Sequence, residues 1–64
     1  MLLEFTIIEH YKNNAPEPFG FMLFESIPKI GAKVQLKWLD GSDAHKVRIT
    51  AVSEVNLEIH VQKE

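Results

Sequence analysis

The chain has 64 residues, enough for one small domain and too few for a second core. It contains no cysteine, which excludes disulfides and thiolate metal sites, and its net charge of −2 argues against a chain that coats nucleic acid non-specifically. We therefore expect one domain over residues 1–64. Because so small a core supplies only about 3–5 kcal/mol, we expect self-association to add stability.

Composition and spacing also limit cofactors and location. The three histidines, His10, His45 and His60, form no short-spaced pair, so we predict neither a metal site nor a cofactor. The first residues lack the basic segment of a signal peptide, and no stretch approaches the about 20 apolar residues of a membrane span. We expect a cytoplasmic protein that does not enter a membrane.

The first part of the chain predicts two strands joined by a loop. Residues 2–11 alternate, with Leu3, Phe5 and Ile7 on one face. Residues 12–18 are polar and contain two prolines, which is typical of an extended loop. Residues 19–24 are apolar on both faces, which predicts a strand covered on both sides. Gly20 within this strand favours a bulge or a tight bend.

The second part predicts three more strands. Pro28 and Gly31 favour a turn over residues 26–31. Strands follow over residues 32–39, 45–52 and 56–62, with a turn at 40–43 and a short connection at 53–55. All three alternate strictly between apolar and polar residues. The apolar positions are Val34, Leu36 and Trp38, then Val47, Ile49 and Ala51, then Leu57, Ile59 and Val61.

These elements predict an all-β fold, a small five-stranded antiparallel meander without helices. The layout of a first strand, a longer irregular loop, a meander of short strands and a tight last turn resembles small SH3-like barrels. The resemblance implies a partly open barrel. It also implies a binding module rather than a catalyst, because such barrels are usually binding modules.

Parity gives candidate registers, because apolar residues must face apolar residues. We predict Trp38 opposite Val47 and Leu36 opposite Ile49 in the central hairpin, and Ile49 opposite Ile59 in the last one. Trp38 then belongs to the core. A slip by two residues preserves parity, so other registers remain open.

The outward residues of the last three strands form a candidate anion-binding face. The predicted registers align Lys37, Arg48 and His60 in one row, where like charges would repel unless an anion bound there. A phosphate would take a bidentate contact from Arg48 and a charge from Lys37. With Lys33 and Lys46, four of the seven basic residues share this face. An ordinary solvated strand face explains the same residues, so nucleic-acid binding is the alternative hypothesis.

Surplus hydrophobic residues form a candidate protein interface. Six of them fall opposite the main apolar face: Leu2, Ile8, Met22, Phe24, Leu39 and Val52. The four on the first two strands, Leu2, Ile8, Met22 and Phe24, form a contiguous patch if those strands pair, and such patches usually mark interfaces. Closure into a barrel is the competing explanation. The exposed edge of the first strand is a second candidate contact.

No motif in the chain predicts catalysis. A glycine-rich phosphate loop and a nucleophile elbow are both missing. Ser42, Asp43 and His45 crowd one turn, but such residues are ordinary in turns. We therefore predict a non-enzymatic protein-interaction module that self-associates as a homodimer or larger homo-oligomer. The alternative is nucleic-acid or anion binding through the basic face.

Overall fold

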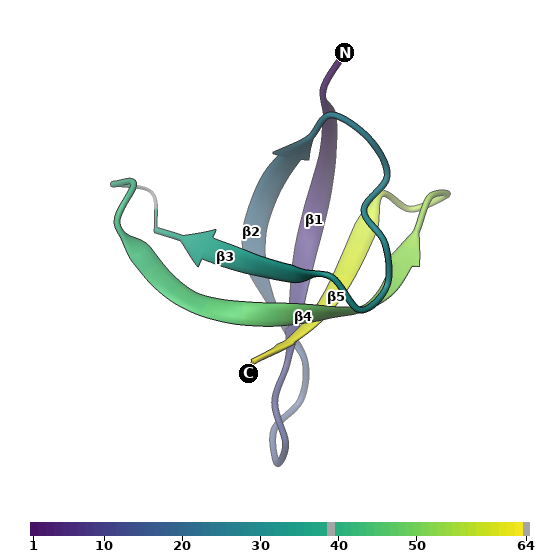
Figure 1. The fold of residues 1–64 in the computed structure, drawn as a ribbon. Helices are drawn as coiled ribbons and strands as arrows, with labels where there is room; N and C mark the ends of the chain where they lie inside the picture. Colours follow the sequence, from purple (N-terminus) through teal and green to yellow (C-terminus); the bar gives the residue numbers. More distant parts are fainter. Residues whose placement is uncertain (39, 64) are drawn as a thin grey trace.

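The computed structural model describes residues 1–38 and 40–63 and has five strands. They are β1 (Leu3–His10), β2 (Glu17–Phe24), β3 (Lys33–Lys37), β4 (Asp43–Ser53) and β5 (Glu58–Lys63). Together they form one strongly curved sheet, an open half-barrel (Figure 1). The predicted all-β fold is confirmed. The expected end of the third strand, Leu39, lies outside the described residues.

The strand order is β2-β1-β5-β4-β3, and the sheet is mixed. Neighbouring strands are antiparallel except β1 and β5, which are parallel, with Ile7 opposite Ile59. The prediction of a purely antiparallel meander is therefore wrong. Residues 25–32 carry the chain from β2 at one edge to β3 at the other, so the first strand pairs with the last (Figure 1). The alternation of apolar and polar residues could not predict the parallel pair, because it is the same in parallel and antiparallel strands.

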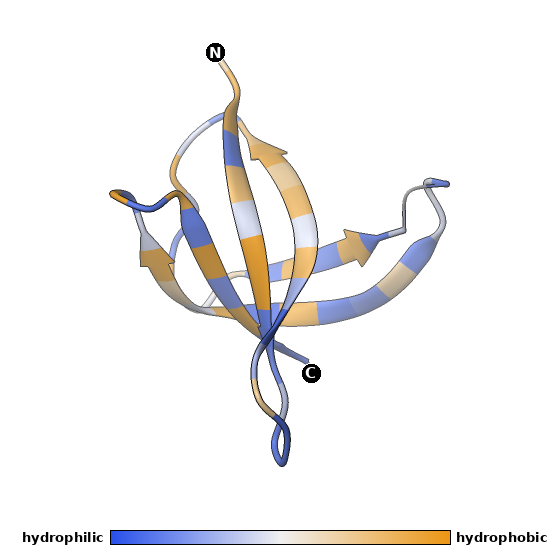
Figure 2. Ribbon diagram, turned by 180° about the vertical axis from the view of Figure 1, so that it is seen from behind, coloured by the Kyte–Doolittle hydropathy of each residue, from blue (hydrophilic) through white to orange (hydrophobic). Residues whose placement is uncertain are grey.

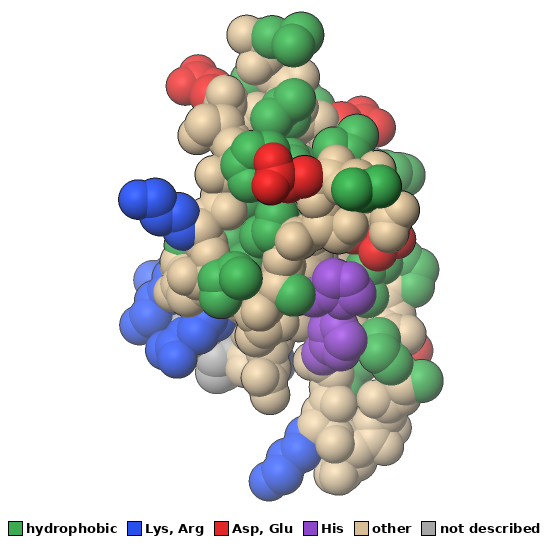
Figure 3. Space-filling model, turned by 90° about the vertical axis from the view of Figure 1, so that its right-hand side faces the viewer, with side chains coloured by type: hydrophobic (Ala, Val, Ile, Leu, Met, Phe, Trp, Pro, Cys, Tyr) green, Lys and Arg blue, Asp and Glu red, His purple; other side chains and the backbone are tan. Residues whose placement is uncertain are grey.

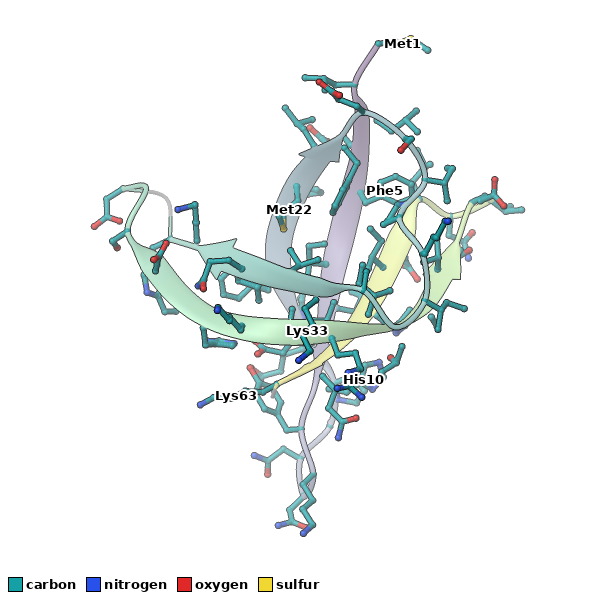
Figure 4. The ribbon with its side chains drawn as sticks, viewed as in Figure 1. Met1, Phe5, His10, Met22, Lys33 and Lys63 are labelled. Carbon is teal, nitrogen blue, oxygen red and sulfur yellow. The ribbon has the colours of Figure 1, made fainter. Side chains whose placement is uncertain are left out.

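The core lies on the concave side of the sheet. Seven hydrophobic residues from β1, β3, β4 and β5 are fully buried there: Phe5, Ile7, Leu36, Val47, Ile49, Ile59 and Val61. From β2, three partly buried side chains pack against them: Phe19, Met22 and Phe24. Figure 4 shows Phe5 and Met22 inside the curve of the sheet.

The assignment of Met22 and Phe24 to the outer face is therefore wrong. Met22 lies opposite the buried Phe5, and the Phe24 ring packs edge-on against Phe5 with centroids 5.8 Å apart. The outward residues of β2 are Phe21 and Leu23, which are 69% and 57% exposed. The interface predicted at residues 2, 8, 22 and 24 does not form one patch.

A bulge explains the reversed faces of β2. Ile7 lies opposite Gly20 but Ile8 lies opposite Pro18, so Phe19 is an extra residue on the β2 side. Gly20 has a φ of +154°, which other residues rarely adopt. The extra residue allows Phe19 and the even-numbered residues that follow Gly20 to face the same core. The sequence predicted a bulge at Gly20 but not the change of face.

The hairpin registers also differ from the predicted ones. Val47 lies opposite Val34 instead of Trp38, and Ile49 lies opposite Val61 instead of Ile59. Both shifts are by an even number of residues, so the apolar side chains stay on one face. A second irregularity between Ile49 and Ala51 then exchanges the faces of β4. Val52 packs against the core as a result, whereas Ala51 is exposed.

Two more residues leave their predicted core positions. Trp38 follows β3 and is 54% exposed, although its backbone N–H still bonds to Ser42 O across the hairpin. Leu57 lies in the turn before β5 rather than opposite Ala51, with a φ of 53° and 42% exposure.

Candidate functional site

The predicted basic row of Lys37, Arg48 and His60 is not present. Lys37 lies opposite Asp43 and donates a 2.8 Å hydrogen bond to its Oδ1. Arg48 lies between Lys33 and Gln62, and His60 lies one row away, opposite Ala51. The predicted row was wrong because it depended on hairpin registers that differ from those in the structure.

A basic outer face exists nevertheless. Lys33, Lys46 and Arg48 are exposed on the outer side of the β3–β4 hairpin. Lys33 lies directly opposite Arg48, so two like charges face each other across the ladder. Figure 3 shows Lys and Arg side chains gathered along one flank of the molecule.

The two edges of the sheet meet through aromatic side chains. Phe19 of β2 and Trp38 after β3 pack with ring centroids 5.3 Å apart, and Phe19 also lies edge-on to His45. Among residues 1–38 and 40–63 no backbone ladder joins β2 to β3. A shallow hollow beside this contact is lined by Phe19, Gly20, Phe21, Lys37 and Trp38.

The free edge of β2 is apolar. From Pro18 to Phe24 the strand carries no charged residue, and the second half of β2 has no hydrophilic residue (Figure 2). β2 pairs with β1 on one side only, so its other side lacks a strand partner within the described chain. An uncharged, apolar edge strand is a template for pairing with another strand.

His45, which packs against Phe19, also contacts a buried carboxylate, Glu9, that the sequence analysis did not identify. Glu9 is 1% exposed, on the same face as Phe5 and Ile7. Its Oε2 accepts a hydrogen bond from His45 Nε2, and its Oε1 accepts one from Tyr11 Oη at 2.9 Å. This hydrogen bond, together with partial burial, raises the pKa of the Tyr11 phenol above its usual 10.0. The sequence does contain a signal for this burial, because Glu9 continues the two-residue spacing of Leu3, Phe5 and Ile7.

The outer face of β1 and β5 holds a histidine pair. His10 Nε2 and His60 Nδ1 are 2.7 Å apart, and Glu58 Oε1 lies 3.6 Å from His60 Nε2. Two histidine side chains touch on the surface in Figure 3. The parallel β1–β5 ladder, which the sequence did not predict, brings them together.

The turn residues Ser42, Asp43 and His45 do not act together. Ser42 bonds to Asp40, Asp43 bonds to Lys37, and His45 bonds to Glu9. The two hydrogen bonds from Ser42 lower the pKa of the Asp40 carboxyl. These three residues of the turn therefore form no catalytic triad.

Comparison of the chain with protein-family models, with curated proteins and with solved structures found no match. The described part of the chain contains no helix with the length and apolar character that crossing a membrane requires.

Proposed function

We propose that this protein is a non-enzymatic interaction module that self-associates by pairing the β2 edge of one copy with the β2 edge of another. The observation that carries the proposal is the apolar edge of β2, where Phe21 and Leu23 are 69% and 57% exposed. Natural proteins usually protect edge strands with charges, prolines or bulges. The first half of β2 has such protection, since Pro18 and the bulge at Phe19 lie there, but residues 20–24 have neither charge nor proline.

The opposite edge of the sheet shows such protection. β3 has five residues and carries exposed Lys33 and Lys37 near its two ends. Short edge strands with lysine resist edge-to-edge pairing. The contrast between the two edges favours β2 as the contact.

A second copy of the chain suits the β2 edge because the segment complements itself. In an antiparallel β2–β2 pair related by a two-fold axis, each strand supplies the same apolar row. Phe21 and Leu23 of both copies would meet on the outer face, and Met22 of both copies would extend the core on the inner face. The pair would bury apolar surface on both faces of the sheet and occupy its unpaired backbone groups. We also propose that the fold is related to SH3-like barrels and that the protein is cytoplasmic.

Sedimentation velocity over a wide range of protein concentration tests the proposal. We expect the wild type to shift from monomer to dimer, and Leu23→Lys to stay monomeric with an unchanged circular dichroism spectrum. Val55→Lys is the matched control, since it adds the same charge at an exposed apolar residue (94%) in the turn before β5. A wild type that stays monomeric, or a Leu23→Lys protein that still dimerises, contradicts the proposal.

Single-stranded nucleic-acid binding is the second candidate, and the exposed Trp38 beside Lys37 favours it. Binding surfaces for single strands combine cations with aromatic rings on which bases stack. Trp38 and Phe21 line one hollow with Lys37, and the basic outer face of β3–β4 begins beside it.

Trp38 is the chain's single tryptophan, so its fluorescence reports stacking directly. In this second case we expect quenching by a short oligonucleotide at low salt, reversed by added salt. Lys46→Gln should weaken binding, whereas Lys29→Gln, in the connection between β2 and β3, should not. An unchanged Trp38 spectrum at low ionic strength excludes this candidate.

A further inference from the structure

We propose that His10 and His60 form a surface site for a transition-metal ion of the copper or zinc class. The two residues lie on the outer face of neighbouring parallel strands, where His60 is opposite Ile8 and His10 is opposite Gln62. Their ring nitrogens, Nε2 of His10 and Nδ1 of His60, face each other at 2.7 Å. The proposal is independent of self-association through β2.

The separation of the rings fits a chelate. A metal bound at about 2.0 Å from an imidazole nitrogen lies about 3.2 Å from the ring centroid. The two centroids are 4.9 Å apart. Two bonds to one metal would then enclose an angle of about 100°, between the values for square-planar and tetrahedral geometry. The imidazoles need to turn about their side-chain bonds so that both nitrogens point at one metal.

Glu58 prepares His60 as a ligand. Its Oε1 lies 3.6 Å from His60 Nε2, beyond hydrogen-bond distance, but the negative charge of the carboxylate favours a proton on that nearer nitrogen. The lone pair of Nδ1 is then available to a metal. With His60 in that tautomer, its Nδ1 is the acceptor in the 2.7 Å contact and His10 Nε2–H is the donor. On binding, His10 takes the tautomer protonated at Nδ1, and both facing lone pairs go to the metal. A carboxylate behind a ligating histidine is a common arrangement in metal sites.

The donor set selects the class of metal. Two imidazoles suit copper, zinc and nickel, whereas calcium and magnesium need several oxygen ligands. Among the described residues no group of three or more His, Cys, Asp or Glu is arranged around one point, so water completes the coordination. A hollow beside the pair, lined by His10, Tyr11, Lys12, Gln62 and Lys63, gives water access. Its two lysines repel every divalent cation alike, so the choice of metal rests on the imidazole donors.

Isothermal titration of the 64-residue chain with Cu²⁺, and separately with Zn²⁺, tests the site. We expect one ion per chain and tighter binding of Cu²⁺, which follows from the general order of metal affinities. His10→Asn and His60→Asn should each weaken Cu²⁺ binding by about tenfold or more, and Glu58→Gln should weaken it by a smaller factor. His45→Gln is the matched control, because this third histidine lies on the concave side with Glu9.

Electron paramagnetic resonance of the Cu²⁺ complex provides a readout that folding defects do not imitate. We expect a spectrum with two imidazole nitrogen ligands in the wild type and one in His10→Asn. No binding by the wild type overturns the proposal. Unchanged binding in both histidine variants, or one ion per two chains, overturns it as well.

Discussion

The indole of Trp38 packs on the ring of Phe19, with centroids 5.3 Å apart and planes tilted by 36°. These two residues belong to opposite edges of the sheet, and no ladder joins those edges within residues 1–38 and 40–63. An aromatic contact therefore stands where a closed barrel would have backbone hydrogen bonds. It links the two edges of the half-barrel, while β2 has no strand partner on that side within the described residues.

A double-mutant cycle measures how strongly this contact closes the sheet. We expect a coupling of about 0.5–1.5 kcal/mol between Phe19→Ala and Trp38→Ala in urea unfolding, since aromatic pairs contribute this much beyond their buried area. The control cycle joins Trp38→Ala to Phe24→Ala, whose ring packs on Phe5 instead. Its coupling should stay below about 0.5 kcal/mol. Equal coupling in both cycles would show that the contact has no specific role.

The buried Glu9 should be important for stability. Glu9→Ala leaves the Tyr11 hydroxyl and the His45 imidazole without their shared acceptor, so we expect a loss of about 1.5–3 kcal/mol in the free energy of unfolding. Glu9→Gln retains an acceptor oxygen and should cost less. Glu4→Ala, at an exposed position of the same strand, should change stability by less than about 0.5 kcal/mol. Equal effects of Glu9→Ala and Glu4→Ala contradict the network.

Tyr11 should titrate above its usual pKa of 10.0, because its hydroxyl donates to the Glu9 carboxylate. A raised pKa means that the folded chain keeps the phenol proton longer than the unfolded chain. The resulting stability is fully present below pH 10 and is lost as the pH rises through the folded-state value. Tyr11 is the single tyrosine, so its absorbance change on ionisation reports it alone. Glu9→Gln should lower this pKa, and an unshifted titration would argue against the hydrogen bond.

Leu57 should be a site of backbone strain. Its φ of 53° lies in the left-handed region, which costs a residue with a side chain about 1–2 kcal/mol. Glycine avoids this cost but is more flexible when unfolded, so we expect Leu57→Gly to stabilise the protein by about 0.5–1 kcal/mol in urea unfolding. Val55→Gly in the same turn relieves no backbone strain, because Val55 does not have a positive φ, so this change should not stabilise the protein. A stabilising Val55→Gly would mean that the gain has another origin.

Alternation along the chain predicted much of the fold. The buried residues of β1 and most of those in β3 to β5 lie on the predicted face, because a two-residue period depends only on strand geometry. The period fails at three irregularities, near Phe19, near Ala51 and opposite Leu36 in β4, where one extra residue exchanges the faces. Local sequence marks such a point weakly, here only by Gly20.

The candidate sites were harder to predict, because each depends on which strands are neighbours. The row through Lys37 and Arg48 required one register, and a slip that preserves parity replaced Lys37 with Lys33. The pair of His10 and His60 required β1 beside β5. Residues fifty positions apart give no signal of such a pairing in a single sequence.

The parallel ladder between β1 and β5 is the one strand pairing, among the described residues, between the N-terminal hairpin and the C-terminal three strands. Severing the chain within residues 25–32 would leave two fragments, each with part of the core. In the intact chain, residues 25–32 keep the two parts at a high effective concentration, which favours their pairing. Mixed in solution, the two fragments should reconstitute the fold without a covalent link. In the intact chain, joining them should be the slow step, since it closes the longest loop.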